Sequence, residues 1–477
     1  MRIHVRKPLV YRRAVRHTQG MDADACYRAA RARDARFDGL FFTAVKTTRI
    51  FCRPVCPART PLRKNVEYFF NAAAAQAAGY RPCLRCRPEV SPEQPVWAGT
   101  SSTVNRALRL IEEGALDSGS TAELAERLGL TDRHLRRLFL EHVGVAPISV
   151  AQTRRILFAK KLITETNLPF SEIAFASGFG SLRRFNEALQ NTYHRNPKEL
   201  RRFTPREGDA QVAIELKLHY RPPYDWRGFI AFVGPRAIPG LEEVTSDTYR
   251  RNGILVTHDP EKNRVSARIE PENAKALRSI SDQIRSFFDL RANTSEIAAH
   301  LSKSDTLKSI VKRHPGLRVP GCWDGFELAV RAMLGQQVTV KGASTLAGRL
   351  VQRFGPPKAE ILADANLAVI GLPKARAESM RLFARAVCDT KIRFDASTSS
   401  EEMIGRMCEL PGIGPWTANY IAMRALADPD AFPAQDLGLL KAARVTSPRR
   451  LAEIAEAWRP WRSYAAMHLW ESLHEVQ

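Results

Sequence analysis

Apolar and polar positions follow different periods in successive parts of the chain. At 212–220, VAIELKLHY places apolar side chains at every second position, which predicts a half-buried β-strand. GILVTHD (253–259) and RVSARIE (264–270), separated by a polar turn, predict a β-hairpin. Residues 100–203 and those from about 297 onward have the period of helices instead. The pattern predicts a multidomain protein that is mainly α with α+β parts.

Residues 21–90 combine both periods in a short stretch. DADACYRAARARDA predicts a helix, FFTAVKTTRIFC an apolar and β-branched strand region, and NAAAAQAAGY a short Ala-rich helix. We expect a small, compact α/β domain here, with Cys26 as a core residue.

Two similar helical units follow within 100–203. In TAELAERLGLTDRHLRRLFLEHVG a short helix ends at Gly129 and Thr131 caps the next helix; in PFSEIAFASGFGSLRRFNEALQ the turn falls at 178–180 and Ser181 is the cap. The pair predicts tandem helix-turn-helix units, which can place two recognition helices in successive major grooves. A helix hairpin with a Gly turn is also common in all-α cores, and this is the alternative for either unit taken alone.

The stretch 410–436 interrupts a helical pattern at LPGIGPW. Pro411, Gly412 and Gly414 predict two helices that fold back on each other around a tight turn. Glycines allow close approach of the backbone, and N–H groups at a helix start favour a phosphate. Asp436 follows among apolar and small residues. The pattern predicts a phosphate-binding hairpin beside one carboxylate; a Gly-Pro turn between core helices with a capping Asp is the alternative.

The net charge of the chain indicates what kind of partner it binds. The formal net charge is +23 and the sequence pI is about 10.0, so a polyanion is the expected partner. The competing polyanion is a membrane surface, but the sequence has neither an apolar run long enough to span a bilayer nor a long basic amphipathic helix. The first residues lack the apolar core of a signal peptide. We therefore expect double-stranded DNA as the partner, no membrane, and a cytoplasmic location.

Four of the eight cysteines are clustered, as Cys52-x-x-x-Cys56 and Cys83-x-x-Cys86. In this spacing two short turns each present two thiolates to one tetrahedral zinc ion, in a reducing compartment. The cluster lies in a basic surround that fits DNA: Arg49, Arg53, Arg59, Lys64, Arg81, Arg85 and Arg87. A closed four-cysteine site is by default structural.

RFDGLFFTAVKTTRIFCRPVCPART with AAGYRPCLRCRPE resembles the N-terminal domain of the Ada methylation-response protein. The resemblance implies that Cys52 accepts a methyl group from a DNA phosphotriester. Zinc would hold the thiol as the nucleophilic thiolate. The phosphate contacts expected within this motif are Arg59, Arg81 and Arg85. Many family members have Gly where this chain has Arg49, so we expect an altered turn there.

The order of the two helical units, with GFGS in the second and RNPKELR after it, is similar to the AraC-type transcription regulators. The resemblance implies a promoter-binding activator, with RNA polymerase as a further partner. Arg and Asn can make bidentate contacts to guanine and adenine edges. The candidates for reading bases are Arg133, Arg137, Arg183, Arg184 and Asn186.

LPGIGPWTAN with a downstream Asp resembles the helix-hairpin-helix superfamily of DNA glycosylases, and WRPWRSYAAMHLW narrows it to the AlkA-type 3-methyladenine glycosylases. The resemblance implies that Asp436 supports cleavage of the base–sugar bond and that Gly412 and Gly414 contact DNA. Bifunctional members have a Lys where this chain has Trp416. Because that amine would form the Schiff base with the sugar, its absence predicts a monofunctional glycosylase.

The same resemblance implies an aromatic base pocket of Trp416, Tyr420 and Trp470, suited to a cationic base by cation–π attraction. In GCWDGFELAVRAMLGQQVTVKGA, Gln337 corresponds to the side chain that fills the gap left by the extruded base, where the best-known family member has Leu. No cysteine follows Cys408, so the iron–sulfur cluster of some relatives is not expected.

The predicted organisation has seven segments. They are a disordered basic extension (1–20), the Ada-like zinc methyl-acceptor domain (21–90), a linker (91–99), the AraC-type double helix-turn-helix domain (100–203), a second linker (204–211), the AlkA-like N-terminal α+β domain (212–296) and the helix-hairpin-helix glycosylase domain (297–477). We expect a monomer that senses methyl phosphotriesters, regulates transcription and excises alkylated bases. The alternative is a transcription regulator whose glycosylase module only binds DNA.

Overall fold

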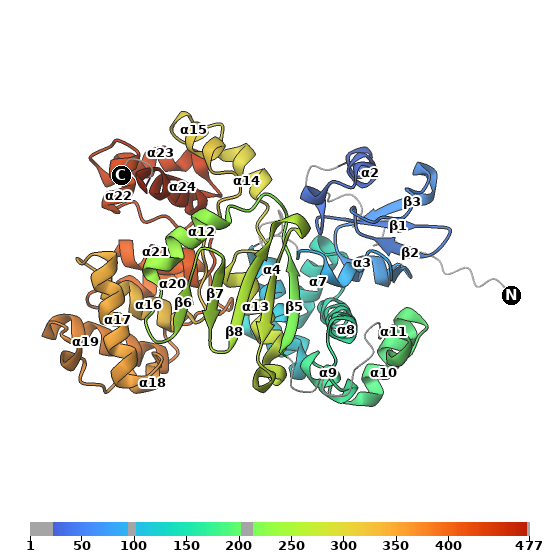
Figure 1. The fold of residues 1–477 in the computed structure, drawn as a ribbon, viewed down its shortest axis with the longest axis horizontal. Coiled ribbons are helices and arrows are strands. Elements are labelled where there is room, and N and C mark those ends of the chain that lie inside the picture. The colour runs from blue at the N-terminus through green and yellow to red at the C-terminus, as the bar shows by residue number, and fades with distance from the viewer. Residues whose placement is uncertain (1–21, 94–101, 202–212, 475–477) are drawn as a thin grey trace. The chain divides into compact units, whose positions relative to one another are not determined.

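The computed structural model describes residues 22–93, 102–201 and 213–474 (Figure 1). The predicted extension 1–20, the linker 204–211 and most of the linker 91–99 lie outside these residues. Contacts divide the chain into two compact units: residues 1–221 with 262–282, and residues 222–261 with 283–477. The predicted zinc and helix-turn-helix domains therefore share one unit, and the hairpin at 410–436 belongs to the other.

The first unit begins with a small sheet that carries the clustered cysteines. Its elements are α2 (Ala23–Ala32), β1 (Phe42–Val45), β2 (Ile50–Cys52), β3 (Val66–Phe69), α3 (Ala72–Ala77), β4 (Arg81–Pro82) and the 3₁₀ turn η3 (Pro88–Val90). The strand order is β3-β1-β2-β4; β1 is antiparallel to β2 and β3, whereas β2 and β4 are parallel. Phe42, Phe51 and Tyr80 form the core on one side, and Cys26, only 1% exposed, lies in the core on the other. The prediction for Cys26 is confirmed.

The helical part of the first unit contains both predicted helix-turn-helix pairs. Its helices are α4 (Ser102–Glu112), α5 (Ala115–Ser118), α6 (Thr121–Arg127), α7 (Asp132–His142), α8 (Pro147–Glu165), α9 (Phe170–Ala176), α10 (Leu182–Tyr193) and α11 (Pro197–Leu200). Thr131 caps α7 by accepting from His134 N, and Ser181 caps α10 by accepting from Arg184 N, both at 3.3 Å. Both caps are confirmed, and α8 is the helix that joins the two pairs.

Strands form in the three stretches where the sequence predicted them, and two further strands, at 242–244 and 248–251, were not predicted. In the first unit β5 (Ile214–His219) pairs antiparallel with β9 (Arg264–Ile269). In the second unit β6 (Glu242–Val244), β7 (Thr248–Arg251) and β8 (Ile254–Asp259) form an antiparallel meander. The boundary between the units passes through α13 (Leu277–Phe287).

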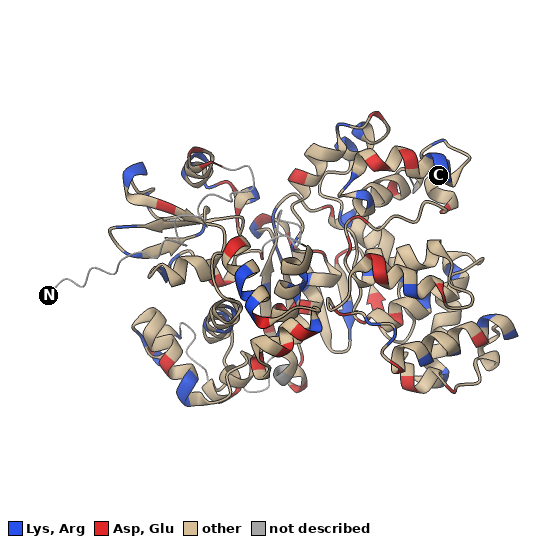
Figure 2. Ribbon diagram, turned by 180° about the vertical axis from the view of Figure 1, so that it is seen from behind, with Lys and Arg blue, Asp and Glu red and all other residues tan. Residues whose placement is uncertain are grey.

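The rest of the second unit is helical. Its helices are α12 (Trp226–Val233) with the 3₁₀ turn η5 (Gly234–Arg236), α14 (Thr294–Leu301), α15 (Asp305–Arg313), α16 (Gly325–Leu334), α17 (Val340–Phe354), α18 (Ala359–Leu362), α19 (Lys374–Cys388), α20 (Ser400–Cys408), α21 (Pro415–Ala425), α22 (Leu437–Ala442), α23 (Pro448–Ala455) and α24 (Arg462–His474). None of the helices described here is both long and apolar enough to cross a membrane. Basic side chains occur along both units rather than in one segment (Figure 2).

Candidate functional sites

The four clustered cysteines form one metal site. Their Sγ atoms all lie within 4.8 Å of one another. Zn–S bonds of about 2.3 Å place the sulfur atoms of a tetrahedral site about 3.8 Å apart, so the donor set fits one zinc ion. Cys52 ends β2, and Cys83 and Cys86 follow β4, so the pairing of these strands brings the two halves of the motif together.

The two cysteine pairs differ in their surroundings. Cys83 and Cys86 are buried, and each sulfur accepts a backbone N–H, from Arg85 at 3.4 Å and from Arg53 at 3.3 Å. Cys52 and Cys56 are only partly buried. Of the two pairs, Cys52 and Cys56 are therefore the cysteines that remain partly accessible.

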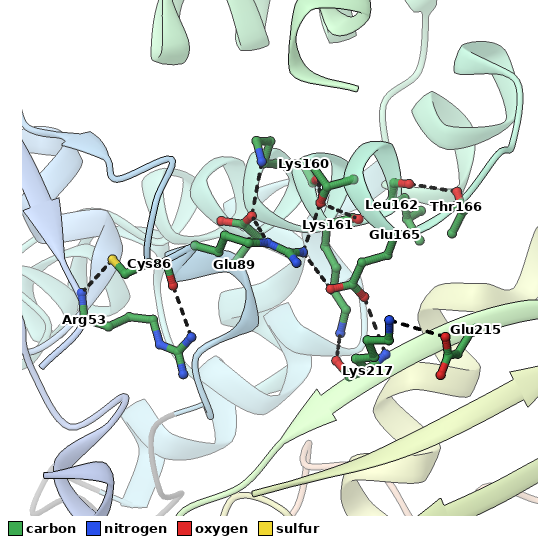
Figure 3. Close-up of polar contacts among 12 residues, drawn as sticks. Arg53, Cys86, Glu89, Lys160, Lys161, Leu162, Glu165, Thr166, Glu215 and Lys217 are labelled. Carbon is green, nitrogen blue, oxygen red and sulfur yellow. Dashed lines mark hydrogen bonds and ion pairs between the residues drawn. The ribbon is translucent and has the colours of Figure 1, made fainter. Parts of the chain in front are cut away.

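Ion pairs also hold the segment that follows Cys86 to α8 (Figure 3). Arg53 donates to the Cys86 carbonyl at 3.1 Å. Three residues after Cys86, Glu89 accepts from Lys160 of α8 at 3.2 Å, and both side chains are at most 2% exposed. Arg87 bridges Glu89 at 3.1 Å and Glu165 of α8 at 2.6 Å. The segment that supplies two zinc ligands is thus held to the helix that joins the helix-turn-helix pairs.

The basic residues around the zinc site divide into two groups. Arg59 and Arg85 are exposed and Arg81 is partly exposed, as contacts to phosphate need. Arg53 instead forms a buried ion pair with Asp38 and faces the protein. Fewer of the predicted basic residues are therefore exposed around the zinc site than the sequence suggested.

Arg49, where many proteins of the resembled family have glycine, has a backbone conformation that glycine adopts easily. Its φ is 55°, in the left-handed region that costs a residue with a side chain roughly 1 kcal/mol. The guanidinium lies 4.6 Å from the centroid of the Tyr80 ring and donates to the Ala78 carbonyl at 3.2 Å. These contacts hold Arg49 in a conformation that glycine adopts without strain.

The residues predicted to read bases lie on the two expected recognition helices. All five are exposed: Arg133 and Arg137 on α7, and Arg183, Arg184 and Asn186 on α10. On both helices the exposed positions alternate with buried ones such as Leu135 and Phe185. The polar faces are therefore open for a partner.

In the second unit α20 and α21 form the predicted hairpin. Gly412 has φ 81°, and a Cβ there would lie 2.4 Å from Ser379 Oγ, so only glycine fits. Gly414 is the N-cap of α21, a Cβ there would meet nothing within 4 Å, and Pro415 takes the first helical position. No side chain caps this helix, which leaves its first N–H groups facing outward for an anion.

Asp436 is held by three donors next to this hairpin. It is the N-cap of α22, where Oδ1 accepts from Leu439 N at 2.9 Å. The same Oδ1 accepts from Trp470 Nε1 at 2.9 Å, and Oδ2 accepts from Trp416 Nε1 at 2.8 Å. A Cβ on Gly438 would lie 3.0 Å from Oδ1 and 3.4 Å from the Trp470 ring, so a glycine there leaves room for the indole. Hydrogen bonds to both of its oxygens therefore fix the carboxylate in place.

The three predicted pocket aromatics lie together around Asp436. Tyr420 stacks on Trp416 with ring centroids 5.5 Å apart and meets Trp470 edge-on at 6.2 Å. Trp416 and Tyr420 are one turn apart on α21, and Phe232 of α12 stacks on Trp470 at 6.2 Å. The arrangement gives a flat base several aromatic faces beside one carboxylate.

Gln337 lies in the turn between α16 and α17, is exposed and has φ 57°. The sequence did not single out its neighbour Gln336, whose Nε2 donates to the Gly412 carbonyl at 2.8 Å and to Thr417 Oγ1 at 2.9 Å. Gln336 thus connects this turn to the hairpin by hydrogen bonds. Its position next to Gln337 in the GQQ turn is the feature of the sequence that could have identified it.

Sequence reasoning also missed three arginines behind the aromatic residues: Arg236 of η5, Arg331 of α16 and Arg424 of α21. Arg424 donates to the Tyr420 hydroxyl at 2.7 Å and to the carbonyls of Pro320 and Gly321. In the sequence, only its position eight residues after Trp416 in the same predicted helix indicated that Arg424 could lie on the same helix face.

Comparisons with known proteins identify the family of this chain. Family models match the metal binding domain of Ada at 25–89, a helix-turn-helix domain at 124–202 and the AlkA N-terminal domain at 215–324. A Mycobacterium tuberculosis protein named "Probable bifunctional transcriptional activator/DNA repair enzyme AlkA" is 40% identical over 480 residues, which are 95% of this chain and 97% of that protein. The chain belongs to this family of bifunctional activator and repair enzymes.

Other relatives match its two parts separately. DNA-3-methyladenine glycosylase 2 of Escherichia coli is 33% identical over 279 residues, 53% of this chain and 95% of the relative. The bifunctional transcriptional activator/DNA repair enzyme Ada of Escherichia coli is 41% identical over 133 residues, 28% of this chain and 36% of the relative. The bifunctional family member described here joins an Ada-type zinc and helix-turn-helix regulator to an AlkA-type DNA glycosylase.

Proposed function

We propose that the second unit hydrolyses the bond between an alkylated base and its sugar, with Asp436 as the catalytic carboxylate. A base such as 3-methyladenine carries positive charge, so its bond to the sugar is already weakened. Trp416 and Trp470 hold Asp436 where it can stabilise the oxocarbenium-like sugar and accept the proton of the attacking water. The observation that carries this proposal is one oriented carboxylate among three aromatic rings. The hairpin N–H groups would bind a phosphate, and Gln337 would enter the gap in the duplex.

Release of 3-methyladenine from methylated DNA tests this assignment. Asp436→Asn keeps the shape and the capping oxygen of the side chain but removes its charge. We expect the single-turnover rate to fall by at least a hundredfold while DNA affinity changes little. An Asp436→Asn protein as active as the native one would overturn the catalytic role. A native protein that binds methylated DNA but releases no base would favour a regulator whose glycosylase module only binds DNA.

We further propose that Cys52 takes a methyl group from a DNA methyl phosphotriester. The thiolate attacks the methyl carbon, a new S–C bond forms, and the phosphodiester anion leaves. When bound, zinc would keep the sulfur deprotonated. One Zn²⁺ with four thiolates carries a net charge of −2, which becomes −1 after one thiolate is methylated. The site then repels phosphate less, and promoter affinity rises.

Mass spectrometry after incubation with methyl-phosphotriester DNA would locate the transferred methyl group. We expect S-methylcysteine at Cys52 and none at Cys26, which lies in the core of the same domain. Methyl transfer to another ligand, or to no cysteine, would refute this role for Cys52.

The remaining proposals concern contacts with DNA and partners. Arg133, Arg137, Arg183, Arg184 and Asn186 would read bases, and Arg59, Arg81 and Arg85 would contact phosphates near the zinc site. Two helix-turn-helix pairs in one chain allow a monomer to cover two successive major grooves. We place this activator in the cytoplasm, where thiols stay reduced and it can contact RNA polymerase.

A further inference from the structure

The side chain of Gln336 connects the turn that carries Gln337 to the hairpin formed by α20 and α21. Its Nε2 donates to the Gly412 carbonyl at 2.8 Å and to Thr417 Oγ1 at 2.9 Å. A carbonyl oxygen only accepts hydrogen bonds, so the amide atom that faces Gly412 must be the nitrogen. Both N–H groups of the amide therefore have partners on the hairpin, and the amide cannot turn over without losing them.

The two acceptors lie on different parts of the hairpin. Gly412 belongs to the loop and has φ 81°, whereas Thr417, 3% exposed, lies in the first turn of α21. Gln336 therefore holds the loop and the start of the helix together at the end of the hairpin that would bind phosphate. Thr417 also directly follows Trp416, which donates to Asp436 Oδ2 at 2.8 Å. The contact is thus one residue away from a side chain that orients the carboxylate.

The turn that carries Gln337 needs such support from its neighbours. Gln337 has φ 57°, a conformation that a residue with a side chain adopts only where the surrounding structure holds it. Thr339 fixes one end of the turn, because it caps α17 by accepting from Gly342 N at 3.1 Å. The bonds of Gln336 fix the other end. Between these two anchors the side chains of Gln337 and Val338 are exposed, so the anchors set the direction in which both project.

We propose that Gln336 is a positioning residue that keeps Gln337 aligned with the hairpin while an extruded base is held in the pocket. This role rests on the proposed glycosylase function. Gln337 would enter the duplex and the hairpin would hold the phosphate of the same DNA, so a displacement of one against the other slows the reaction. Because both of its N–H groups are bound to the hairpin, Gln336 acts through the placement of Gln337.

A purely structural role for Gln336 makes a different prediction. The helices on either side of the contact, α16 and α21, already pack against each other, and the residues before the turn, Met333 and Leu334, are buried. The fold of this region therefore has its own apolar support. If Gln336 only stabilised the hairpin, its loss would weaken binding to any duplex. If it positions Gln337, its loss affects only the state in which Gln337 has entered the duplex.

Fluorescence of 2-aminopurine beside an abasic-site analogue reports entry of Gln337, because entry unstacks the neighbouring base and no bond is cleaved. The full zinc-loaded chain is used. Gln336→Met keeps the length of the side chain and removes both hydrogen bonds; we expect about tenfold weaker affinity measured by this signal and less than twofold change on undamaged DNA. Thr417→Val removes one of the two bonds and should cost about threefold. Gln283→Met is the matched control, because it removes a bond of 3.2 Å to the Trp323 carbonyl in the same unit, and it should change neither value more than twofold.

A double variant shows whether Gln336 acts through Gln337. Gln337→Ala removes the side chain that is positioned, so adding Gln336→Met to it should lower the affinity by less than a further twofold. A further tenfold loss in the double variant, an equal loss on undamaged DNA, or a native signal in Gln336→Met would each overturn this inference and leave the proposed function intact. A native protein that gives the signal but releases no 3-methyladenine would overturn the proposed function alone, and one that gives neither would overturn both.

Discussion

At the scale of single residues, the indole N–H of Trp470 is the contact whose loss is easiest to isolate. Trp470→Phe keeps an aromatic ring in the pocket but removes the donor to Asp436 Oδ1. A hydrogen bond to a charged group contributes roughly 1.5–3 kcal/mol, so we expect the rate of base excision to fall about tenfold or more. Trp458→Phe is the matched control, because it removes an indole bond of 3.0 Å to Ser304 elsewhere in the same unit. Equal rates in the two variants would contradict the positioning of Asp436 by Trp470.

A second prediction at this scale concerns His219 and pH. Burial, together with Arg53, Lys161, Arg264 and Arg87, lowers the pKa of His219 to about 2, from 6.5. Below pH 6.5 the unfolded chain binds a proton that the folded chain does not, so stability falls as pH falls. Between pH 6.5 and 5 the loss is up to about 2 kcal/mol. His219→Gln should remove this part of the pH dependence, measured as the difference between the two proteins in denaturant unfolding at pH 7 and pH 5. An unchanged difference would show that His219 is protonated in the fold.

At the scale of elements, the link between η3 and α8 decides how firmly the zinc-binding segment is held. Glu89→Gln removes the buried carboxylate that pairs with Lys160 and Arg87. Removing one member of a buried pair costs about 3 kcal/mol or more. We therefore expect half of the zinc to be released from the full chain at a lower denaturant concentration than in the native protein. Asp24→Asn, which removes the same charge from an exposed pair with Arg63, should change the midpoint little. If both variants behave alike, the buried link does not contribute to stability.

The same scale shows what could be predicted from the sequence and why. The helix-turn-helix pairs were predictable because the signals of each turn, a Gly followed by the capping Thr131 or Ser181, are adjacent in the chain. The four cysteines were predictable because zinc requires their spacing. The arginines around Tyr420 were not, because an arginine on a helix ordinarily faces solvent. Only the packing of η5, α16 and α21 brings Arg236, Arg331 and Arg424 together, and no local pattern encodes that.

At the scale of the whole molecule, the two chemistries lie in different compact units. All four zinc ligands belong to the first unit, and Asp436 and its aromatic partners belong to the second. The zinc domain has a small core, so its fold depends strongly on the metal. The ligand segment is in turn bound to α8, between the helix-turn-helix pairs. Loss of zinc should therefore weaken promoter binding more than it slows base excision.

Zinc removal by a strong chelator tests this division. We expect promoter affinity to fall at least tenfold, because the segment that carries Cys83 and Cys86 no longer supports α8, while the excision rate at saturating enzyme changes less than twofold. Cys83→Ser should reproduce the effect of the chelator without any chelator present. Cys26→Ala alters a buried cysteine of the same domain that is no ligand, and it should retain zinc and promoter affinity. A parallel loss of both activities in Cys83→Ser would mean that the glycosylase unit depends on the zinc domain for its own fold.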